Sequence, residues 1–135
     1  MQGLRLYKAE KLCSRTAVNQ LFEQGHSAIA FPLRMVYRLH DPDGEASARF
    51  LITIPKKKIR HAVGRVLLRR RVREAYRLCR RTLLHPALEQ AGLGADIAFV
   101  YLDKEPASYH TIESRLRQLL TRVAQAAQSQ NTLNS

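Results

Sequence analysis

The chain alternates between segments whose apolar residues recur at helical spacing and segments where they recur at every second position. Ser14, a residue type that favours helix N-caps, precedes a short amphipathic segment that Gly25 closes, so a helix is predicted between them. A longer helical stripe predicts a second helix, and its members are Leu68, Val72, Ala75, Tyr76, Cys79 and Leu83. A third helix is predicted after Pro106-Ala107-Ser108, with an inner face of Ile112, Leu116, Leu119, Leu120 and Val123.

Three other segments have the pattern of β-strands. Residues 28–40 alternate, with Leu33, Met35, Tyr37 and Leu39 on one face and Arg34, Val36 and Arg38 on the other. Asp41-Pro42-Asp43-Gly44 is typical of a turn, and a second strand is predicted over residues 48–54, before Pro55. After a loop at residues 92–94, residues 96–102 predict a buried strand.

The predicted order of elements is α-β-β-α-β-α, with one strand more if the first strand breaks near Pro32. A strand, a long helix and another strand form a crossover, which predicts a single α/β (α+β) domain with helices packed on a mixed sheet. We assign this domain to residues 1–127 and expect the polar residues 128–135 to form a frayed tail.

Positive charge is concentrated in one segment of the chain. The formal net charge is +12, and 12 of the 23 lysine and arginine residues lie between Lys56 and Arg81, where Glu74 is the one acidic residue. The other 109 residues are nearly balanced, with 11 basic and 10 acidic side chains. This distribution favours a polyanionic partner, because each phosphate that a protein neutralises releases condensed counterions.

The basic segment coincides with the second predicted helix. On a helical wheel, the arginines beside the apolar stripe are Arg69, Arg73, Arg77 and Arg80, with Arg70 and Arg81 further round. One face is therefore expected to pack on a core while a broad arginine face meets phosphates. A merely solvated face would carry interspersed glutamates for i, i+4 pairing, and only Glu74 is present.

The sequence carries no catalytic or metal-binding pattern. Nucleotide-binding glycine loops, a serine-hydrolase elbow and H-E-x-x-H are missing, and the histidines lack metal-ligand spacing. We therefore predict no catalytic residue and no metal site on the protein. Cys13 and Cys79 are expected to be reduced thiols. The chain has no apolar run long enough to span a membrane and no signal peptide, so we expect it in the cytoplasm and not in a membrane.

Residues 49–65 (RFLITIPKKKIRHAVGR) and 70–77 (RRVREAYR) resemble the signature of the bacterial ribonuclease P protein subunit. That family has a strand ending in two lysines, a spacer, and a helix that opens Arg-Asn-Arg and continues through basic residues to Arg-Glu and an aromatic. The resemblance extends over almost the whole chain. Residues 21–25 look like the first helix of the family, residues 35–37 like its first strand, and residues 106–108 like the cap of its last helix.

The sequence departs from the family pattern at two places. Where the family has Arg-Asn-Arg, the chain keeps Arg65 but has Val66 and Leu67 at the next two positions, so an apolar contact replaces a polar one. Val18 stands where the family often has an aromatic residue of its substrate cleft. We interpret the chain as a diverged member with a weaker or re-routed RNA contact.

The resemblance implies an α/β fold with a left-handed β-α-β crossover and two RNA partners, the catalytic RNA of ribonuclease P and precursor tRNA. The implied RNA-binding residues are Lys56, Lys57, Lys58, Arg60, His61, Arg65, Arg69, Arg70, Arg73 and Arg77. A cleft between the first helix and the sheet would hold the 5′ leader of precursor tRNA at Phe22, Tyr37, Lys56 and Lys57. Hydrolysis would use Mg²⁺ held mainly by the RNA. No stable protein partner is expected.

Three other interpretations use the same residues. A general RNA-binding or ribosome-associated protein would use the arginine helix without a nuclease partner. A peripheral membrane protein would need large apolar residues beside the basic arc, whereas the stripe here contains Ala75 and Cys79. DNA binding agrees with the charge, but no helix-turn-helix or zinc pattern supports it. For Phe22, Tyr37 and His61, core packing, capping or solvation remain alternatives to RNA contact.

Overall fold

The structure is a computed structural model that describes residues 10–42 and 47–134, with side chains described through residue 130. Its elements are α1 (Arg15–Gln24), β1 (His26–Ala30), β2 (Leu33–His40), β3 (Ala48–Thr53), α2 (Ala62–Leu83), α3 (His85–Ala91), β4 (Gly94–Tyr101) and α4 (Tyr109–Asn134). The strands form one sheet of order β1-β2-β4-β3, in which β3 and β4 are parallel and the other pairs antiparallel. The predicted mixed sheet and α+β class are confirmed.

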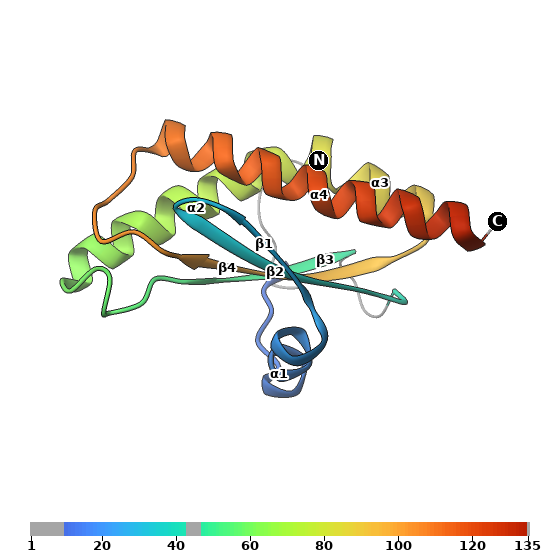
Figure 1. Cartoon of the computed structure of the whole chain (residues 1–135), viewed down its shortest axis with the longest axis horizontal. Helices are drawn as coiled ribbons and strands as arrows, with labels where there is room; N and C mark the ends of the chain where they lie inside the picture. The colour runs from blue at the N-terminus through green and yellow to red at the C-terminus, as the bar shows by residue number, and fades with distance from the viewer. Residues whose placement is uncertain (1–9, 43–46, 135) are drawn as a thin grey trace.

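Helices cover the two faces of the sheet unequally. Helices α2, α3 and α4 lie on one face and α1 lies alone on the other (Figure 1). In the larger core, the ring of Tyr76 stacks on Phe50 with centroids 4.3 Å apart and meets Phe99 edge-on at 5.9 Å. In the smaller core, Leu21 of α1 packs with Val36 and Ala98 of the sheet. The alternation predicted for β2 is confirmed, because Met35 and Tyr37 pack with the larger core and Val36 packs with the smaller one.

The predicted helix caps are present in the structure. Ser14 Oγ accepts a hydrogen bond from the backbone N–H of Ala17 at 3.3 Å, and Ser108 Oγ accepts one from Thr111 at 3.2 Å. Gly25 ends α1 where the helix meets β2 too closely for a side chain. A Cβ at Gly25 would lie 2.3 Å from the Leu21 carbonyl oxygen and 2.8 Å from Val36 Cγ1. Gly25 therefore allows α1 to pack against the sheet.

The first strand breaks at Phe31-Pro32 into β1 and β2, which confirms the predicted alternative with one strand more. The structure differs from the prediction in its helices. Helix α3 was not predicted; Pro86 lies in its first turn, and Gly92, with φ of 68°, ends it. Helix α4 continues to Asn134, so the segment expected to be a frayed tail is helical to that residue, because each added residue gains a backbone hydrogen bond once the packed part is formed. Fraying of these last turns stays a prediction. Residues 43 and 44 of the predicted turn lie outside the described residues.

Hydrogen bonds from β4 and from α2 hold the loop that precedes α4. The hydroxyl of Tyr101 accepts a hydrogen bond from the Ala107 backbone N–H at 2.8 Å and donates one to the Glu105 carbonyl. Arg71 of α2 donates to the Ala107 carbonyl oxygen at 2.6 Å. The loop after β4 is therefore fixed to α2, the helix with eight of the 17 arginines.

Candidate RNA-binding surface

The segment between β3 and α2 is a tight turn that leaves its lysines exposed. The carbonyl oxygen of Pro55 accepts hydrogen bonds from the backbone N–H groups of Lys58 and Ile59, at 3.0 and 3.1 Å. Ile59 is buried against α2, whereas Lys56 and Lys57 are exposed at the outside of the turn. Packing of the apolar residue thus points the two ammonium groups into solvent.

On α2, burial of one stripe determines which arginines face outward. Leu68 and Val72 are fully buried, and Arg69, Arg70 and Arg73, at neighbouring positions of the helix, are exposed. Among the residues that the structure describes, Arg69 and Arg70 make no side-chain hydrogen bond or ion pair. We define the α2 basic surface as the exposed members of this region, namely Lys56, Lys57, Arg60, His61, Arg69, Arg70 and Arg73.

Three further cations from the predicted RNA-binding set are less available. Lys58 is partly buried. Arg65 donates to two backbone carbonyl oxygens of the turn, those of Ile59 at 3.1 Å and Arg60 at 2.7 Å, so its guanidinium caps the turn. Arg77 forms two hydrogen bonds with Glu74, and this contact lowers the pKa of that carboxyl. Arg65 and Arg77 therefore already form hydrogen bonds within the protein, which leaves them less available to RNA phosphates.

Arg80 was expected on the arginine face, and the structure corrects this expectation. Its side chain is 2% exposed, and its Nε donates to Glu10 Oε1 at 2.6 Å. His85 Nε2 lies 3.9 Å from the same carboxylate oxygen, and burial lowers the pKa of this imidazole. The helical wheel placed Arg80 beside the stripe, but the buried carboxylate of a distant segment draws the guanidinium into the protein.

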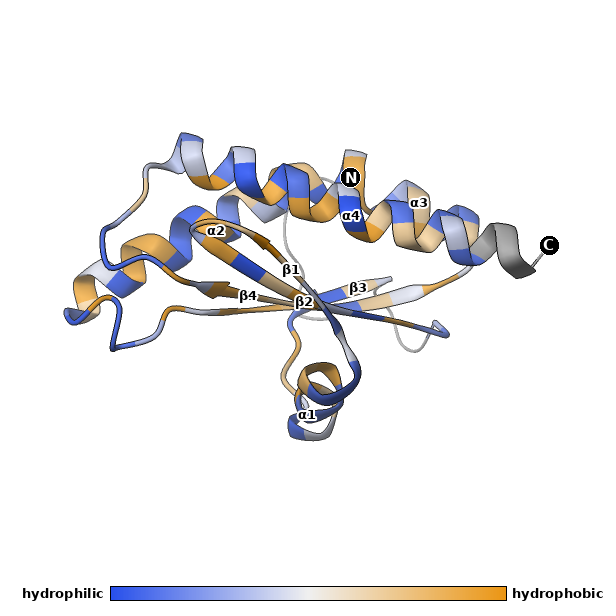
Figure 2. Ribbon diagram, viewed as in Figure 1, coloured by the Kyte–Doolittle hydropathy of each residue, from blue (hydrophilic) through white to orange (hydrophobic). Residues whose placement is uncertain are grey.

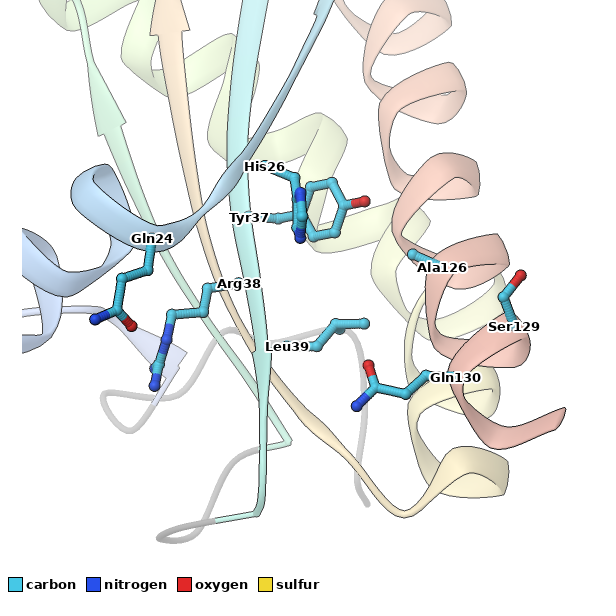
Figure 3. A pocket seen from close by; sticks show the side chains of 8 residues that line it. All are labelled: Gln24, His26, Tyr37, Arg38, Leu39, Ala126, Ser129 and Gln130. Carbon is cyan, nitrogen blue, oxygen red and sulfur yellow. The ribbon is translucent and has the colours of Figure 1, made fainter. Parts of the chain in front are cut away.

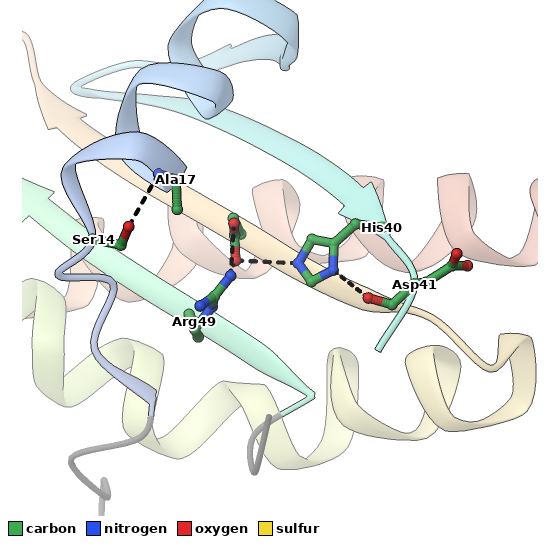
Figure 4. A network of polar contacts seen from close by, with 6 residues as sticks. Ser14, Ala17, His40, Asp41 and Arg49 are labelled. Carbon is green, nitrogen blue, oxygen red and sulfur yellow. Dashed lines mark hydrogen bonds and ion pairs between the residues drawn. The ribbon is translucent and has the colours of Figure 1, made fainter. Parts of the chain in front are cut away.

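On the other face of the sheet, a hollow of about 500 Å³ lies between the start of α1 and the ends of the strands. Its floor contains Asp96, 1% exposed, which accepts hydrogen bonds from Arg49 at 3.0 and 3.2 Å. His40 Nε2 lies 3.2 Å from the same carboxylate, and its Nδ1 donates to the Asp41 carbonyl oxygen at 2.6 Å (Figure 4). Arg38 also lines this hollow, so basic side chains border it. Sequence reasoning placed Arg38 on this face but did not select it as a functional residue.

The structure does not bring Phe22 and Tyr37 into one cleft. Phe22 is on α1 and 44% exposed, whereas Tyr37 points to the opposite face of the sheet, because Val36 beside it faces α1. Tyr37 lines a separate hollow of about 510 Å³ toward α4, with its ring centroid 5.5 Å from that of His26 (Figure 3). The strand alternation in the sequence carried this information, but the cleft assignment came from the resemblance.

The described residues contain neither a membrane-spanning helix nor a metal-binding cluster. None of the described helices has the length and apolar character needed to cross a membrane. Within residues 10–42 and 47–130, no three His, Cys, Asp or Glu side chains lie close enough together to hold a metal ion.

Comparisons with known proteins agree with the motif and the fold. The family model described as Ribonuclease P matches residues 6–124. The ribonuclease P protein component of Porphyromonas gingivalis is 37% identical over 119 residues, covering 88% of this chain and 86% of that protein. The component of Chlorobaculum tepidum is 31% identical, with 85% and 80% covered.

Solved structures show the same architecture. The ribonuclease P protein of Staphylococcus aureus matches with a TM-score of 0.66 at 18% identity, covering 86% of this chain and 96% of that one. The protein from Thermotoga maritima matches with a TM-score of 0.61 at 25% identity, covering 84% and 96%. Because the family model, the relatives and the fold agree, the chain belongs to the family of bacterial ribonuclease P protein components.

Proposed function

We propose that this chain is the accessory protein subunit of a ribonuclease P, which removes the 5′ leader of precursor tRNA, and that its α2 basic surface binds the catalytic RNA. The observation that carries the proposal is the exposure of Arg69, Arg70 and Arg73 beside the Lys56-Lys57 turn, on a chain of this family. Arginine forks match phosphate oxygens in pairs, and a row of them on a rigid helix suits the backbone of a folded RNA.

The 5′ leader is proposed to lie on the α1 face of the sheet. Exposed Phe22 offers a ring on which a base can stack, and Arg38 in the nearby hollow adds positive charge. Single strands are gripped by stacking platforms beside a positive groove. Lys56 and Lys57 add a second group of positive charges beyond the opposite end of β3, since the hollow lies at the start of this strand, where Arg49 is. Tyr37 is left out of this cleft because it faces α4.

The chemical step is proposed to take place on the RNA. Hydrolysis would use Mg²⁺ ions held by the RNA, while the protein neutralises phosphates and adds affinity for the substrate. The proposal assigns no step of the reaction to a side chain of this chain.

The test is cleavage of precursor tRNA at low Mg²⁺ by the cognate catalytic RNA, with and without the protein. We expect the protein to restore leader removal and to cleave nothing alone. RNA binding without any effect on cleavage would favour a general RNA-binding protein instead.

The leader assignment has its own test, the ratio of affinities for precursor and mature tRNA. Phe22→Ala should reduce this ratio by roughly 5- to 100-fold if a base stacks on the ring. Tyr37→Ala, a matched aromatic truncation on the other face, should leave the ratio unchanged. Equal effects of the two substitutions would contradict the placement of the leader.

A further inference from the structure

The first turns of α2 expose apolar side chains next to the arginines. Val63 is 82% exposed, Val66 50% and Leu67 40%, although the same helix buries Leu68 and Val72 completely. Positions i, i+3 and i+4 lie on one face of a helix, so the three form one cluster, which we call the α2 apolar cluster. Figure 2 shows this apolar segment at the end of α2 that follows the Lys56-Lys57 turn.

The fold prevents these side chains from turning inward. The inner side of the first turn is filled by Ile59, which is 8% exposed; a Cβ at Gly64 would lie 2.9 Å from Ile59 Cγ2. Val66 and Leu68 are two residues apart and therefore point in nearly opposite directions. Arg65 does not cover the cluster, since its guanidinium is bonded to the carbonyls of the turn.

Arginines border the cluster on the side toward the middle of the helix. Val66 lines a surface hollow of about 230 Å³ together with Arg69, Arg70 and Arg73. An occupant of this hollow has to offer negative charge to the guanidinium groups and an apolar face to the valine. A second copy of the chain that docked through this same surface would place arginines against arginines, and like charges across an interface are repelled.

An unpaired nucleotide meets both requirements. Its phosphate oxygens accept hydrogen bonds from arginine, and its base presents an apolar face that a paired and stacked base keeps inside the duplex. We propose that the α2 apolar cluster contacts an unpaired base of the RNA partner while Arg69, Arg70 and Arg73 hold the adjoining phosphates. This inference rests on the proposed function, because it takes the partner to be an RNA.

The test compares two RNA hairpins of equal length, one fully paired and one with a single unpaired 2-aminopurine. The full-length protein is compared with Val66→Ala/Leu67→Ala, since alanine keeps helix propensity at these exposed positions. We expect the double variant to lose roughly five- to tenfold in affinity for the hairpin with the unpaired base, and nothing for the paired one. The unchanged protein should alter the fluorescence of 2-aminopurine on binding, and this change should be absent with the double variant.

Leu78→Ala provides the matched control, because Leu78 is an exposed apolar residue of α2 outside the cluster. It should bind both hairpins like the unchanged protein. Equal losses of the double variant on the two hairpins, or no loss on either, would overturn the inference. A membrane would be favoured instead if the unchanged protein and Leu78→Ala bound phosphatidylglycerol vesicles and the double variant did not, while all three bound the hairpins equally. That result would overturn the inference.

A third variant separates this inference from the proposed function. Arg69→Ala/Arg70→Ala/Arg73→Ala should weaken binding to both hairpins. If it does so while Val66→Ala/Leu67→Ala has no effect, the RNA-binding role stands and the base contact is refuted. If the arginine variant also binds normally, the RNA-binding role of α2 fails with it.

Discussion

Removal of three charges from the α2 basic surface should change the salt dependence of RNA binding by a calculable amount. The perturbation is Arg69→Ala/Arg70→Ala/Arg73→Ala, at three exposed positions of a helix whose buried stripe stays intact. Alanine is the best helix former, so the helix itself should persist. The expected loss is therefore in phosphate contacts and not in folding.

The magnitude follows from the number of contacts. Each neutralised phosphate contributes about 0.7 to 0.9 to the slope of log affinity against log salt, so three contacts contribute roughly 2 to 3. Raising the salt concentration fourfold would then weaken the unchanged protein roughly 20- to 40-fold more than the variant. Titration of the labelled catalytic RNA at several salt concentrations measures both slopes.

The matched control removes three arginines from a different element. Arg115, Arg117 and Arg122 of α4 carry the same total charge, and their replacement by alanine tests whether net charge alone sets the slope. We expect this variant to change the slope by less than the value of about 0.7 to 0.9 that one phosphate contact contributes. An unchanged slope in the α2 variant, or equal changes in the two variants, would refute the assignment of phosphate contacts to α2.

Three predictions concern the scaffold. Arg80→Met removes the buried guanidinium from Glu10 and should lower the free energy of unfolding by about 3–5 kcal/mol in urea denaturation, with no change in salt slope; a loss below about 1 kcal/mol would contradict the buried pair. Gly25→Ala should lower the free energy of unfolding by about 1–3 kcal/mol, because its methyl group would overpack against Leu21 and Val36. An unchanged thermal stability would argue against that contact. Because burial lowers the pKa of His85, the unfolded chain binds a proton first as the pH falls through about 6.5, so stability should be lost there. Denaturation curves from pH 7.5 to 5.5 should show a smaller loss for His85→Gln, and parallel curves would speak against this coupling.

Much of the fold could be predicted from periodicity and caps. The stripe from Leu68 to Leu83 and the alternation around Val36 correspond to α2 and β2 as observed. Helix α3 escaped prediction because its seven residues follow α2 directly, and Pro86 at its start resembles a simple helix end. The extent of α4 was underestimated because polar composition does not stop a helix that is already anchored by packing.

The candidate site was predictable only in part, because partners decide which arginines are available. A helical wheel gives the direction of Arg80 but not the presence of Glu10, which comes from a segment 70 residues earlier. The backbone carbonyls that hold Arg65 belong to a turn whose shape depends on burial of Ile59. The local sequence pattern thus predicts where the arginines lie along the helix. Tertiary contacts decide which of them are bound within the protein and which remain exposed.

The position of β4 has a consequence for the order in which the protein can be assembled. Although β4 is the last strand to be synthesised, it lies between β2 and β3, and Leu33 of β2 pairs with Tyr101 of β4. Both cores include residues of β4, such as Phe99 and Ala98. A nascent chain that ends before Gly94 therefore has its arginine helix and the β1-β2 pair, but it lacks the strand that joins β2 to β3. We therefore expect the proposed RNA-binding surface to be held in place only after residues 94–101 have been synthesised.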